Sequence, residues 1–263
     1  IRQAVASCRL VVVRNKKTPG RTLAKHPHVN IAHKYARDVV SGDIPACKWV
    51  RLACQRQLDD LKRWNKSDSP YYFDKVAGER VCTFIENLPH VKGVWAGEKI
   101  KLEPWQCFIW STVFGWKRSS DKYRRFREVY LCVPRKNSKS TQGAAIGLYM
   151  FALDGEAGAE VYSGATTEKQ AWEVFRPARL MATKAPGFAD YYGVDVNASN
   201  IHCLNTASRF EPLIGNPGDG ASPHCAIIDE FHEHRTPQLY DSMITGMGAR
   251  TQPLNLIITT AGT

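Results

Sequence analysis

The sequence predicts an α/β protein in which a mostly parallel sheet is flanked by helices and preceded by a helical region. After residue 127, short apolar runs alternate with segments of helical periodicity, a pattern typical of parallel sheets with crossover helices. Two of these runs, 129–133 and 224–228, are followed directly by polar groups suited to phosphate and metal chemistry. Such groups are expected at the carboxyl edge of a parallel sheet.

The N-terminal region reads as a series of helices. Apolar residues at helical spacing predict two helices over 29–63, separated by Gly42 and Pro45. A turn follows, then a predicted helix over 71–87. Another helix is expected to open at Pro104, because proline suits the first helical turn.

The C-terminal region supplies the predicted sheet. The candidate strands are 128–133, 159–164, 200–204, 208–213, 224–229 and 254–260. The candidate helices are 140–152, 167–184 and 237–247.

Composition narrows the function classes. With 43% hydrophobic and 23% charged residues, the chain resembles ordinary globular proteins. No apolar run approaches the roughly 20 residues of a membrane span, so no membrane partner is expected. The eight cysteines include no C-x-x-C pair, which predicts neither a disulfide framework nor a zinc site and favours a reducing compartment.

The formal net charge is +11, and the excess is concentrated in two segments, 14–21 and 117–127. Such clusters favour a polyanionic partner, with nucleic acid the first candidate. The alternative interpretation is a solvated basic surface.

Residues 129–141 combine the parts of a phosphate-binding loop. An apolar strand-like run breaks at Pro134 into a basic turn, and Lys139-Ser140 then opens an Ala- and Gly-rich helix. Lysine at this point reaches the β- and γ-phosphates, and the serine hydroxyl suits Mg²⁺. The pattern G-x-x-x-x-G-K-[ST] has glycine where this chain has Val133 and Ser138, so a solvated basic turn is the alternative interpretation.

A second motif strengthens the first. The apolar run 224–228 ends in Asp229 and Glu230. Asp229 is placed to hold Mg²⁺, and Glu230 to orient and deprotonate an attacking water. The alternative is a strand that happens to end in acids. His232 and His234 lack further ligands at metal-binding spacing, which favours a polar loop. Together the two motifs predict nucleoside triphosphate hydrolysis.

With these motifs placed, the chain resembles the ATPase half of tailed-phage terminase large subunits, in the group typified by phage HK97. The phosphate loop 133–141 resembles the basic, glycine-poor version in that group. The acidic strand end 227–232 and the segment 254–262, which resembles the coupling motif, also match, as do 36–42 and 102–106. The resemblance implies a P-loop NTPase of the RecA-like (ASCE) type.

The resemblance also implies roles for individual residues. Gln106 is the candidate for recognising adenine, with Trp105 either nearby or simply buried in the core. The nucleotide-binding set is Arg135, Lys136, Asn137, Ser138, Lys139, Ser140 and Thr141, with Ser140 and Asp229 on Mg²⁺. The coupling residues are Thr259, Thr260 and Gly262. Their strand is expected between the phosphate-loop and Asp229 strands.

An arginine from a neighbouring subunit is expected to complete the site. The stretch 219–223, where some terminases carry that arginine, has none. Arg250 and Arg176 are the catalytic candidates besides Glu230, with Arg179 a third, whereas Arg135 is expected to contact phosphate in its own subunit.

The implied activity is hydrolysis of Mg²⁺-ATP to move double-stranded DNA into a procapsid. The implied partners are the portal protein, the small terminase subunit and further copies of the chain. These copies are expected to form a ring, a pentamer, on the procapsid and to be monomers in isolation, in the host cytoplasm. Residues 1–100 are expected to form a basic arm and helical lid subdomain, and 101–263 the ATPase core. The missing initiator Met and the ending after a strand-like run suggest a fragment of a longer polypeptide. The resemblance implies a C-terminal nuclease domain, which is expected to lie beyond this chain.

Two other functions fit parts of the pattern. A helicase shares the Gln, phosphate-loop and Asp-Glu elements but normally needs a second RecA-like domain. A non-catalytic adapter with a degenerate nucleotide fold is disfavoured, because Lys139, Ser140, Asp229 and Glu230 are all present.

Overall fold

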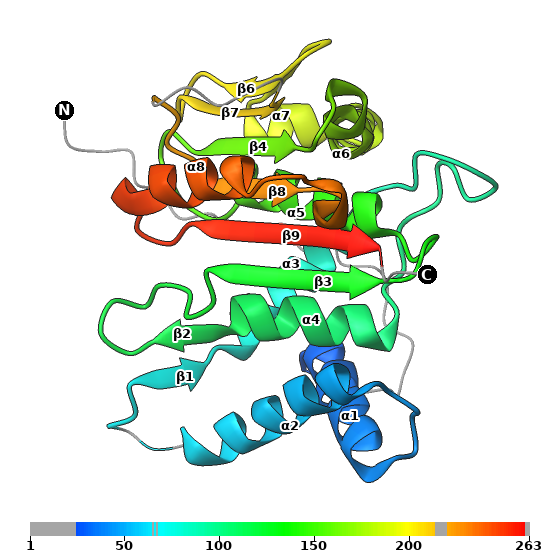
Figure 1. Cartoon of the computed structure of the whole chain (residues 1–263), viewed down its shortest axis with the longest axis vertical. Coiled ribbons are helices and arrows are strands. Elements are labelled where there is room, and N and C mark those ends of the chain that lie inside the picture. Colours follow the sequence, from blue (N-terminus) through cyan, green and yellow to red (C-terminus); the bar gives the residue numbers. More distant parts are fainter. Residues whose placement is uncertain (1–24, 65, 67, 214–219, 261–263) are drawn as a thin grey trace, which may run out of the picture.

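The computed structural model describes residues 25–64, 66, 68–213 and 220–260 (Figure 1). The basic segment 14–21 and the predicted coupling residue Gly262 lie outside them. The N-terminal helices are α1 (Pro27–Ser41), α2 (Lys48–Arg63), α3 (Lys75–Asn87) and α4 (Pro104–Gly115). Gly42 ends α1 with φ 94°, a left-handed conformation that glycine adopts without steric cost.

One predicted helix is shorter than expected. Tyr71–Phe73 form strand β1, which pairs antiparallel with β2 (Trp116–Arg118), and helix α3 begins only at Lys75. The aromatic run favours a strand, and Asp74 then caps the helix by accepting from the backbone N–H groups of Val76 and Ala77 at 2.9 and 3.0 Å. The prediction of a helix from residue 71 was wrong in this first turn.

Within the described residues, the main sheet has seven strands. Their order is β3 (Glu128–Val133), β9 (Leu254–Thr260), β8 (Cys225–Ile228), β4 (Glu160–Gly164), β7 (Ser208–Pro212), β6 (Ile201–Cys203) and β5 (Asp195–Val196). The first five are parallel to one another. Strand β6 pairs antiparallel with β7, and β5 pairs antiparallel with β6. The predicted place of 254–260 between the phosphate-loop strand and the Asp229 strand is confirmed.

Helices cover both faces of this sheet (Figure 1). The remaining helical elements are α5 (Lys139–Ala152), α6 (Glu168–Lys184), α7 (Phe188–Tyr192), η1 (Phe231–Glu233), α8 (Gln238–Gly246) and η2 (Met247–Ala249). Because successive strand residues face opposite ways, Val161 and Ile227 pack in the core beneath α5, while Tyr162 and Ala226 pack with Met243 of α8. Gly147 lets α5 approach the sheet closely, since a Cβ there would lie 2.7 Å from the Phe210 ring.

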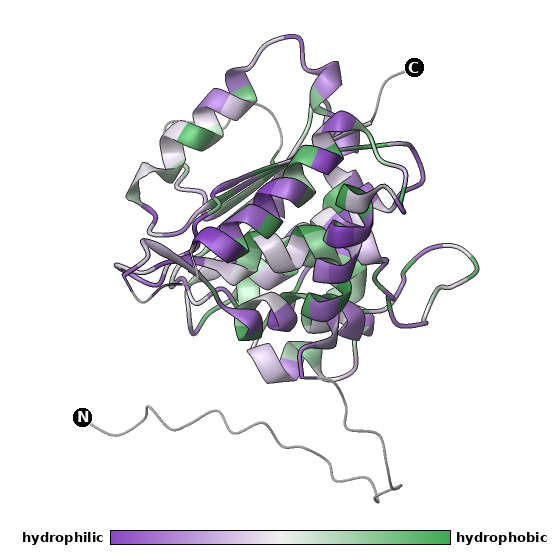
Figure 2. Ribbon diagram, turned by 90° about the horizontal axis from the view of Figure 1, so that it is seen from below, coloured by the Kyte–Doolittle hydropathy of each residue, from purple (hydrophilic) through white to green (hydrophobic). Residues whose placement is uncertain are grey.

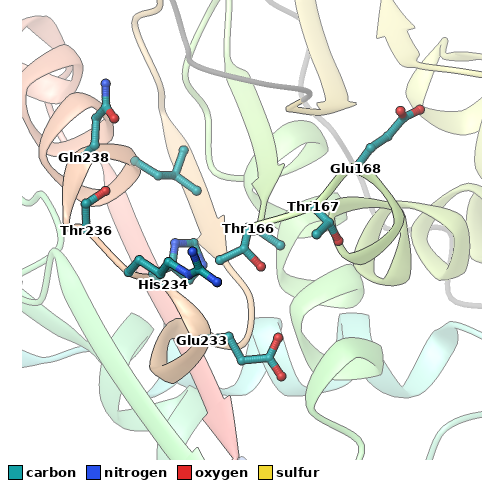
Figure 3. Close-up of a pocket in the computed structure, with 10 residues that line it drawn as sticks. Thr166, Thr167, Glu168, Glu233, His234, Thr236 and Gln238 are labelled. Carbon is teal, nitrogen blue, oxygen red and sulfur yellow. The ribbon is translucent and has the colours of Figure 1, made fainter.

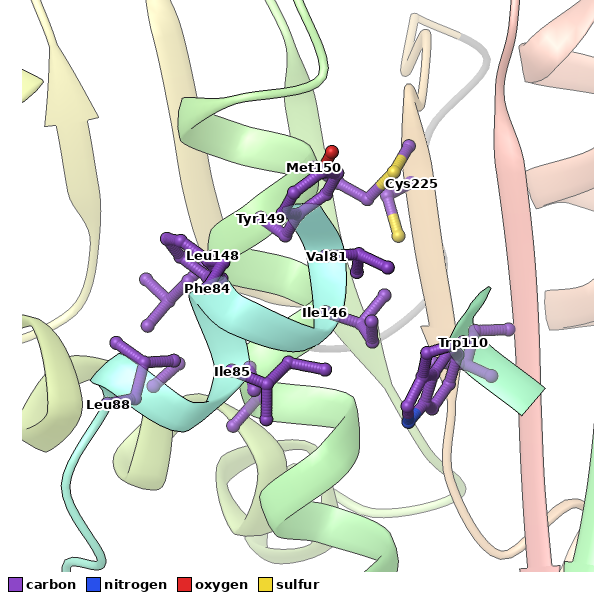
Figure 4. Close-up of a cluster of buried hydrophobic side chains, with 14 of the residues drawn as sticks. Val81, Phe84, Ile85, Leu88, Trp110, Ile146, Leu148, Tyr149, Met150 and Cys225 are labelled. Atoms are coloured by element: carbon purple, nitrogen blue, oxygen red, sulfur yellow. The ribbon is translucent and has the colours of Figure 1, made fainter. Parts of the chain in front are cut away.

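The hydrophobic core runs without a break from the N-terminal helices to the sheet. Phe84 of α3 and Trp110 of α4 belong to the same buried cluster as Ile146 of α5 and Cys225 of β8 (Figure 4). The ring of Phe84 lies edge-on to that of Tyr149, with 5.4 Å between centroids. The expected boundary at residue 100 therefore crosses a continuous core, and division into two units there stays a prediction.

The outer helices mix hydrophilic and hydrophobic residues along their length, as amphipathic surface helices do (Figure 2). Among the described residues, no helix has the length and apolar character that crossing a membrane requires.

Part of the basic segment 117–127 takes part in ion pairs inside the fold and is not free basic surface. Arg124 is fully buried and pairs with Asp154 at 2.8 Å, and Arg125 pairs with Asp60 at 2.8 Å. These arginines therefore tie elements of the fold together. Lys122 and Arg127 remain exposed.

Candidate active site

The three neighbouring strands β3, β9 and β8 are parallel, so their carboxyl ends meet at one edge of the sheet. This edge carries a cavity of about 660 Å³ that holds both predicted motifs. The residues of the two motifs that line the cavity are Arg135, Lys136, Ser138, Lys139, Ser140, Thr141, Asp229 and Glu230. The structure thus brings the phosphate loop and the acidic pair together.

The phosphate loop achieves its turn without glycine. Lys136 and Ser138 adopt left-handed conformations, with φ of 66° and 57°. Such a conformation costs a non-glycine residue about 1–2 kcal/mol, so the loop stores strain at Lys136 and Ser138, and the usual pattern has glycine at the second of these positions. The departure at Ser138 changes the residue but keeps the backbone shape that glycine would supply.

Lys139 is buried at the start of α5, only 8% exposed. Its Nζ lies 3.5 Å from the carbonyl oxygens of both Val133 and Pro134, so the side chain folds back across the loop. These long contacts compensate a positive charge only weakly. The ammonium group is therefore suited to bind an anionic oxygen in the cavity.

A series of hydrogen bonds links the phosphate loop to helices α4 and α5, and no sequence motif indicated it. The Trp110 indole N–H donates to Gln142 Oε1 at 2.9 Å, and Gln142 Nε2 donates to the Asn137 carbonyl at 3.2 Å. Asn137 Nδ2 in turn donates to the Pro134 carbonyl at 3.1 Å. A polar residue at position 142, followed on the same helix by Ala, Gly and large apolar residues, is the signal that points to this role.

Asp229 is 4% exposed, and burial, followed by the nearby charge of Glu230, raises the pKa of its carboxyl to about 6. Its Oδ1 accepts from the backbone N–H of Glu230 at 2.8 Å. A buried carboxylate with little charge compensation suits a divalent cation. Together with the Ser140 hydroxyl in the same cavity it provides the hard oxygen donors that Mg²⁺ prefers.

This burial yields a test of stability. At pH 7 an ionised Asp229 opposes folding, because the folded pKa of about 6 exceeds the ordinary value of 3.8. The shift of roughly two units corresponds to about 3 kcal/mol. We expect Asp229→Asn to raise the Tm of the Mg²⁺-free protein at pH 7. As pH falls below about 6, wild-type Asp229 takes up a proton and the advantage should shrink. An equal or lower Tm for the variant at pH 7 would contradict this account.

Glu230 lies one residue further, with a left-handed backbone of φ 46°. Its carboxylate accepts from the Thr260 hydroxyl at 2.8 Å and from the Thr260 backbone N–H at 3.2 Å. Thr260 therefore contacts the candidate base directly, and its coupling role stays a prediction. Thr259 contacts His232, whose Nδ1 lies 2.8 Å from its hydroxyl oxygen.

Gln106 and Trp105 are absent from the described lining of this cavity. Gln106 is 6% exposed, and its Oε1 accepts from the backbone N–H of Glu103 at 2.9 Å, which caps α4. Trp105 is half-buried and packs against the core. The adenine-binding role of Gln106 stays a prediction.

The two arginine candidates lie in different surroundings. Arg250 precedes β9, at the opposite end of the sheet from the phosphate loop, and its side chain is 12% exposed. It donates to the Ser222 carbonyl at 2.8 Å and pairs with Glu156 at 3.5 Å. Arg176 is exposed on α6, one turn from the cavity-lining Glu173. A finger at Arg250 would first have to break contacts within its own subunit.

The cavity walls contain residues that no motif indicated. His90, Val91 and Lys92 form one wall, and Lys92 reaches Glu173 of α6 at 3.4 Å across the opening. Beyond Glu233 lies a second hollow of about 580 Å³ between the segments 165–168 and 233–239 (Figure 3). These walls depend on loops brought together by folding, so no local pattern predicts them.

A phosphate loop, a buried carboxylate and a second carboxylate beside it, at one edge of a parallel sheet, are the arrangement typical of a P-loop NTPase. Residues 104–263 match the family described as "Terminase large subunit, ATPase domain". The chain belongs to this family, which confirms the resemblance and the fold class.

The chain is also similar to individual proteins. The crystal structure of the HK97 bacteriophage large terminase is 28% identical with a TM-score of 0.58, over 69% of this chain and 37% of that one. The large terminase ATPase domain of Thermus phage P74-26 is 20% identical with a TM-score of 0.39, over 51% of this chain and 59% of that one. Protein YmfN of Escherichia coli (strain K12) is 69% identical over 45 residues, which are 17% of this chain and 10% of YmfN. The match thus spans about a third of the HK97 protein.

Proposed function

We propose that this chain hydrolyses Mg²⁺-ATP to move double-stranded DNA into a viral procapsid. The observation that carries the proposal is the meeting of Lys139, Asp229 and Glu230 in one cavity at the sheet edge. Ser140 and Asp229 would hold Mg²⁺, which neutralises developing phosphate charge when bound. Lys139 would bind phosphate oxygens, and Glu230 would take the proton from the attacking water.

The proposal includes the assembly in which such an ATPase works. The family membership supports a portal protein, a small terminase subunit and further copies of this chain as partners. We place the protein in the host cytoplasm, as a monomer until it docks at the portal vertex as a ring of five copies. The cutting of packaged DNA would belong to a nuclease domain of the whole protein.

Hydrolysis is the first point to test. Purified protein should turn over ATP with Mg²⁺, and Lys139→Ala should lose both ATP binding and turnover. Lys122→Ala is a matched control, because this lysine is exposed and lies over the Tyr72 ring rather than in the cavity. ATP binding without turnover by the wild-type protein would favour the adapter. DNA unwinding by this chain alone would favour the helicase.

This chain should bind DNA weakly and should not cleave it. Because Arg124 and Arg125 are held in ion pairs, few basic residues of 117–127 are free to contact phosphate, and we expect a low affinity for duplex DNA that decreases as salt is added. The described residues hold no cluster of three or more His, Cys, Asp or Glu that would bind a metal ion, as a two-metal nuclease requires. A plasmid-nicking assay with Mg²⁺ or Mn²⁺ should therefore show intact DNA. Metal-dependent cleavage would refute this prediction.

A further inference from the structure

The loop that carries Glu230 contacts two neighbouring residues at the end of β9, Thr259 and Thr260. Neighbouring strand residues point to opposite faces of a sheet, so Thr259 and Thr260 present their hydroxyls in opposite directions. His232 meets the first, with its backbone N and its Nδ1 at 3.3 and 2.8 Å from Thr259 Oγ1. Glu230 meets the second, with its two carboxylate oxygens at 3.0 and 2.8 Å from Thr260 Oγ1.

The two oxygens of the Glu230 carboxylate differ in the number of groups that they contact. Oε2 faces the Thr260 hydroxyl at 2.8 Å, the Thr260 backbone N–H at 3.2 Å and His232 Nδ1 at 3.4 Å. Oε1 faces the Thr260 hydroxyl alone among these groups, at 3.0 Å. Each carboxylate oxygen has about two acceptor positions, and one hydroxyl proton serves only one oxygen at a time. Oε1 therefore keeps the greater capacity to accept a proton from water.

The backbone supports the same orientation. The left-handed conformation of Glu230 turns the chain sharply after β8, and its N–H is held by Asp229 Oδ1 at 2.8 Å. The residue is thus joined to the metal carboxylate through its backbone and to β9 through its side chain. A change at the Thr260 side chain would therefore act on this carboxylate directly.

We propose that Thr260 and His232 are positioning residues for the general base. They hold Oε2 and leave Oε1 for the attacking water, so the end of β9 sets the activity of Glu230. This inference rests on the proposed ATP hydrolysis and names the groups through which β9 would act on it. It assigns a function to His232, whose spacing had indicated only a polar loop.

The first test removes the Thr260 hydroxyl while keeping the size of the side chain. Thr260→Val replaces the hydroxyl by a methyl group of similar size and keeps the backbone N–H. We expect kcat to fall about 10- to 100-fold, as for a misplaced catalytic group, while KM changes less than about twofold. Thr260→Ser should restore most of the rate. Thr245→Val is the matched control, since this exposed threonine donates to the Asp241 carbonyl at 2.7 Å on α8.

His232 is tested in the same way. His232→Ala should lower kcat with little change in KM. His232→Asn keeps a polar nitrogen close to the position of Nδ1 and should retain more of the rate. Equal losses in the alanine and asparagine variants would remove His232 from the proposal.

A double substitution distinguishes positioning from general damage. If Thr260 acts through Glu230, adding Thr260→Val to Glu230→Gln should cause no further loss of residual turnover. An independent further loss, or wild-type kcat in Thr260→Val alone, would overturn the inference while the ATPase assignment stands. Absence of turnover in the wild-type protein would overturn both.

Discussion

Glu230→Gln should bind Mg²⁺-ATP about as well as the wild-type protein and yet lose at least about 100-fold in turnover. The amide has nearly the shape of the carboxylate, and its oxygen can still accept from the Thr260 hydroxyl and backbone N–H. It is not basic enough to take a proton from water. The substitution therefore removes the chemical step and leaves the cavity intact.

Comparison with Lys139→Ala separates nucleotide binding from the chemical step. That substitution removes the buried cation at the start of α5, so nucleotide binding should fail together with turnover. Equilibrium binding of a non-hydrolysable ATP analogue, measured beside steady-state turnover, separates the two variants. Near-normal turnover by Glu230→Gln would remove Glu230 from its role as base.

The core of the sheet was predictable because its signals are local. Strand 128–133 and strand 254–260 occur at their predicted residues, since short apolar runs bounded by turns identify strands. Strand 254–260 is buried along almost its whole length, whereas strand 128–133 lies at the edge of the sheet and alternates in burial. The place of 254–260 between its neighbours came from the family resemblance, and the pairing of β9 with β3 on one side and with β8 on the other confirms it. Motif positions were predictable for the same reason, as the loop and the acids directly follow strands.

Other features depend on contacts that only the folded chain reveals. The aromatic run 71–73 pairs with residues 116–118, more than 40 positions away, and this pairing takes it out of the predicted helix. The sequence did not indicate that Arg124 is buried, because its partner Asp154 lies just after α5 and is 30 positions away. Both side chains are buried. The Glu230–Thr260 contact likewise joins the ends of two strands that are adjacent only in the sheet.

The remaining large effect concerns an arginine supplied by a neighbouring subunit, whose contribution to phosphoryl transfer is typically roughly 10³–10⁵ in rate. Of the candidates, Arg176 has the exposure that a trans contact requires, with its guanidinium 5.3 Å from the Trp172 ring. Arg179 is half-buried on the same helix. Arg250 pairs with Glu156 and Glu160. Its removal should act mainly on the stability of its own subunit.

Mixed assemblies distinguish these outcomes. Glu230→Gln subunits have no base but retain every arginine, whereas Arg176→Ala subunits retain the base. If Arg176 acts in trans, each preparation alone should be nearly inactive, and mixing them in the assembled motor should restore turnover at the intact base sites. Arg179→Ala can be mixed in the same way. Arg250→Ala should show a lower Tm and gain nothing from mixing, because its defect lies within the subunit that carries it. Rescue of Arg250→Ala instead would identify that residue as the finger, and no rescue of any of the three would leave the site without a trans arginine among them.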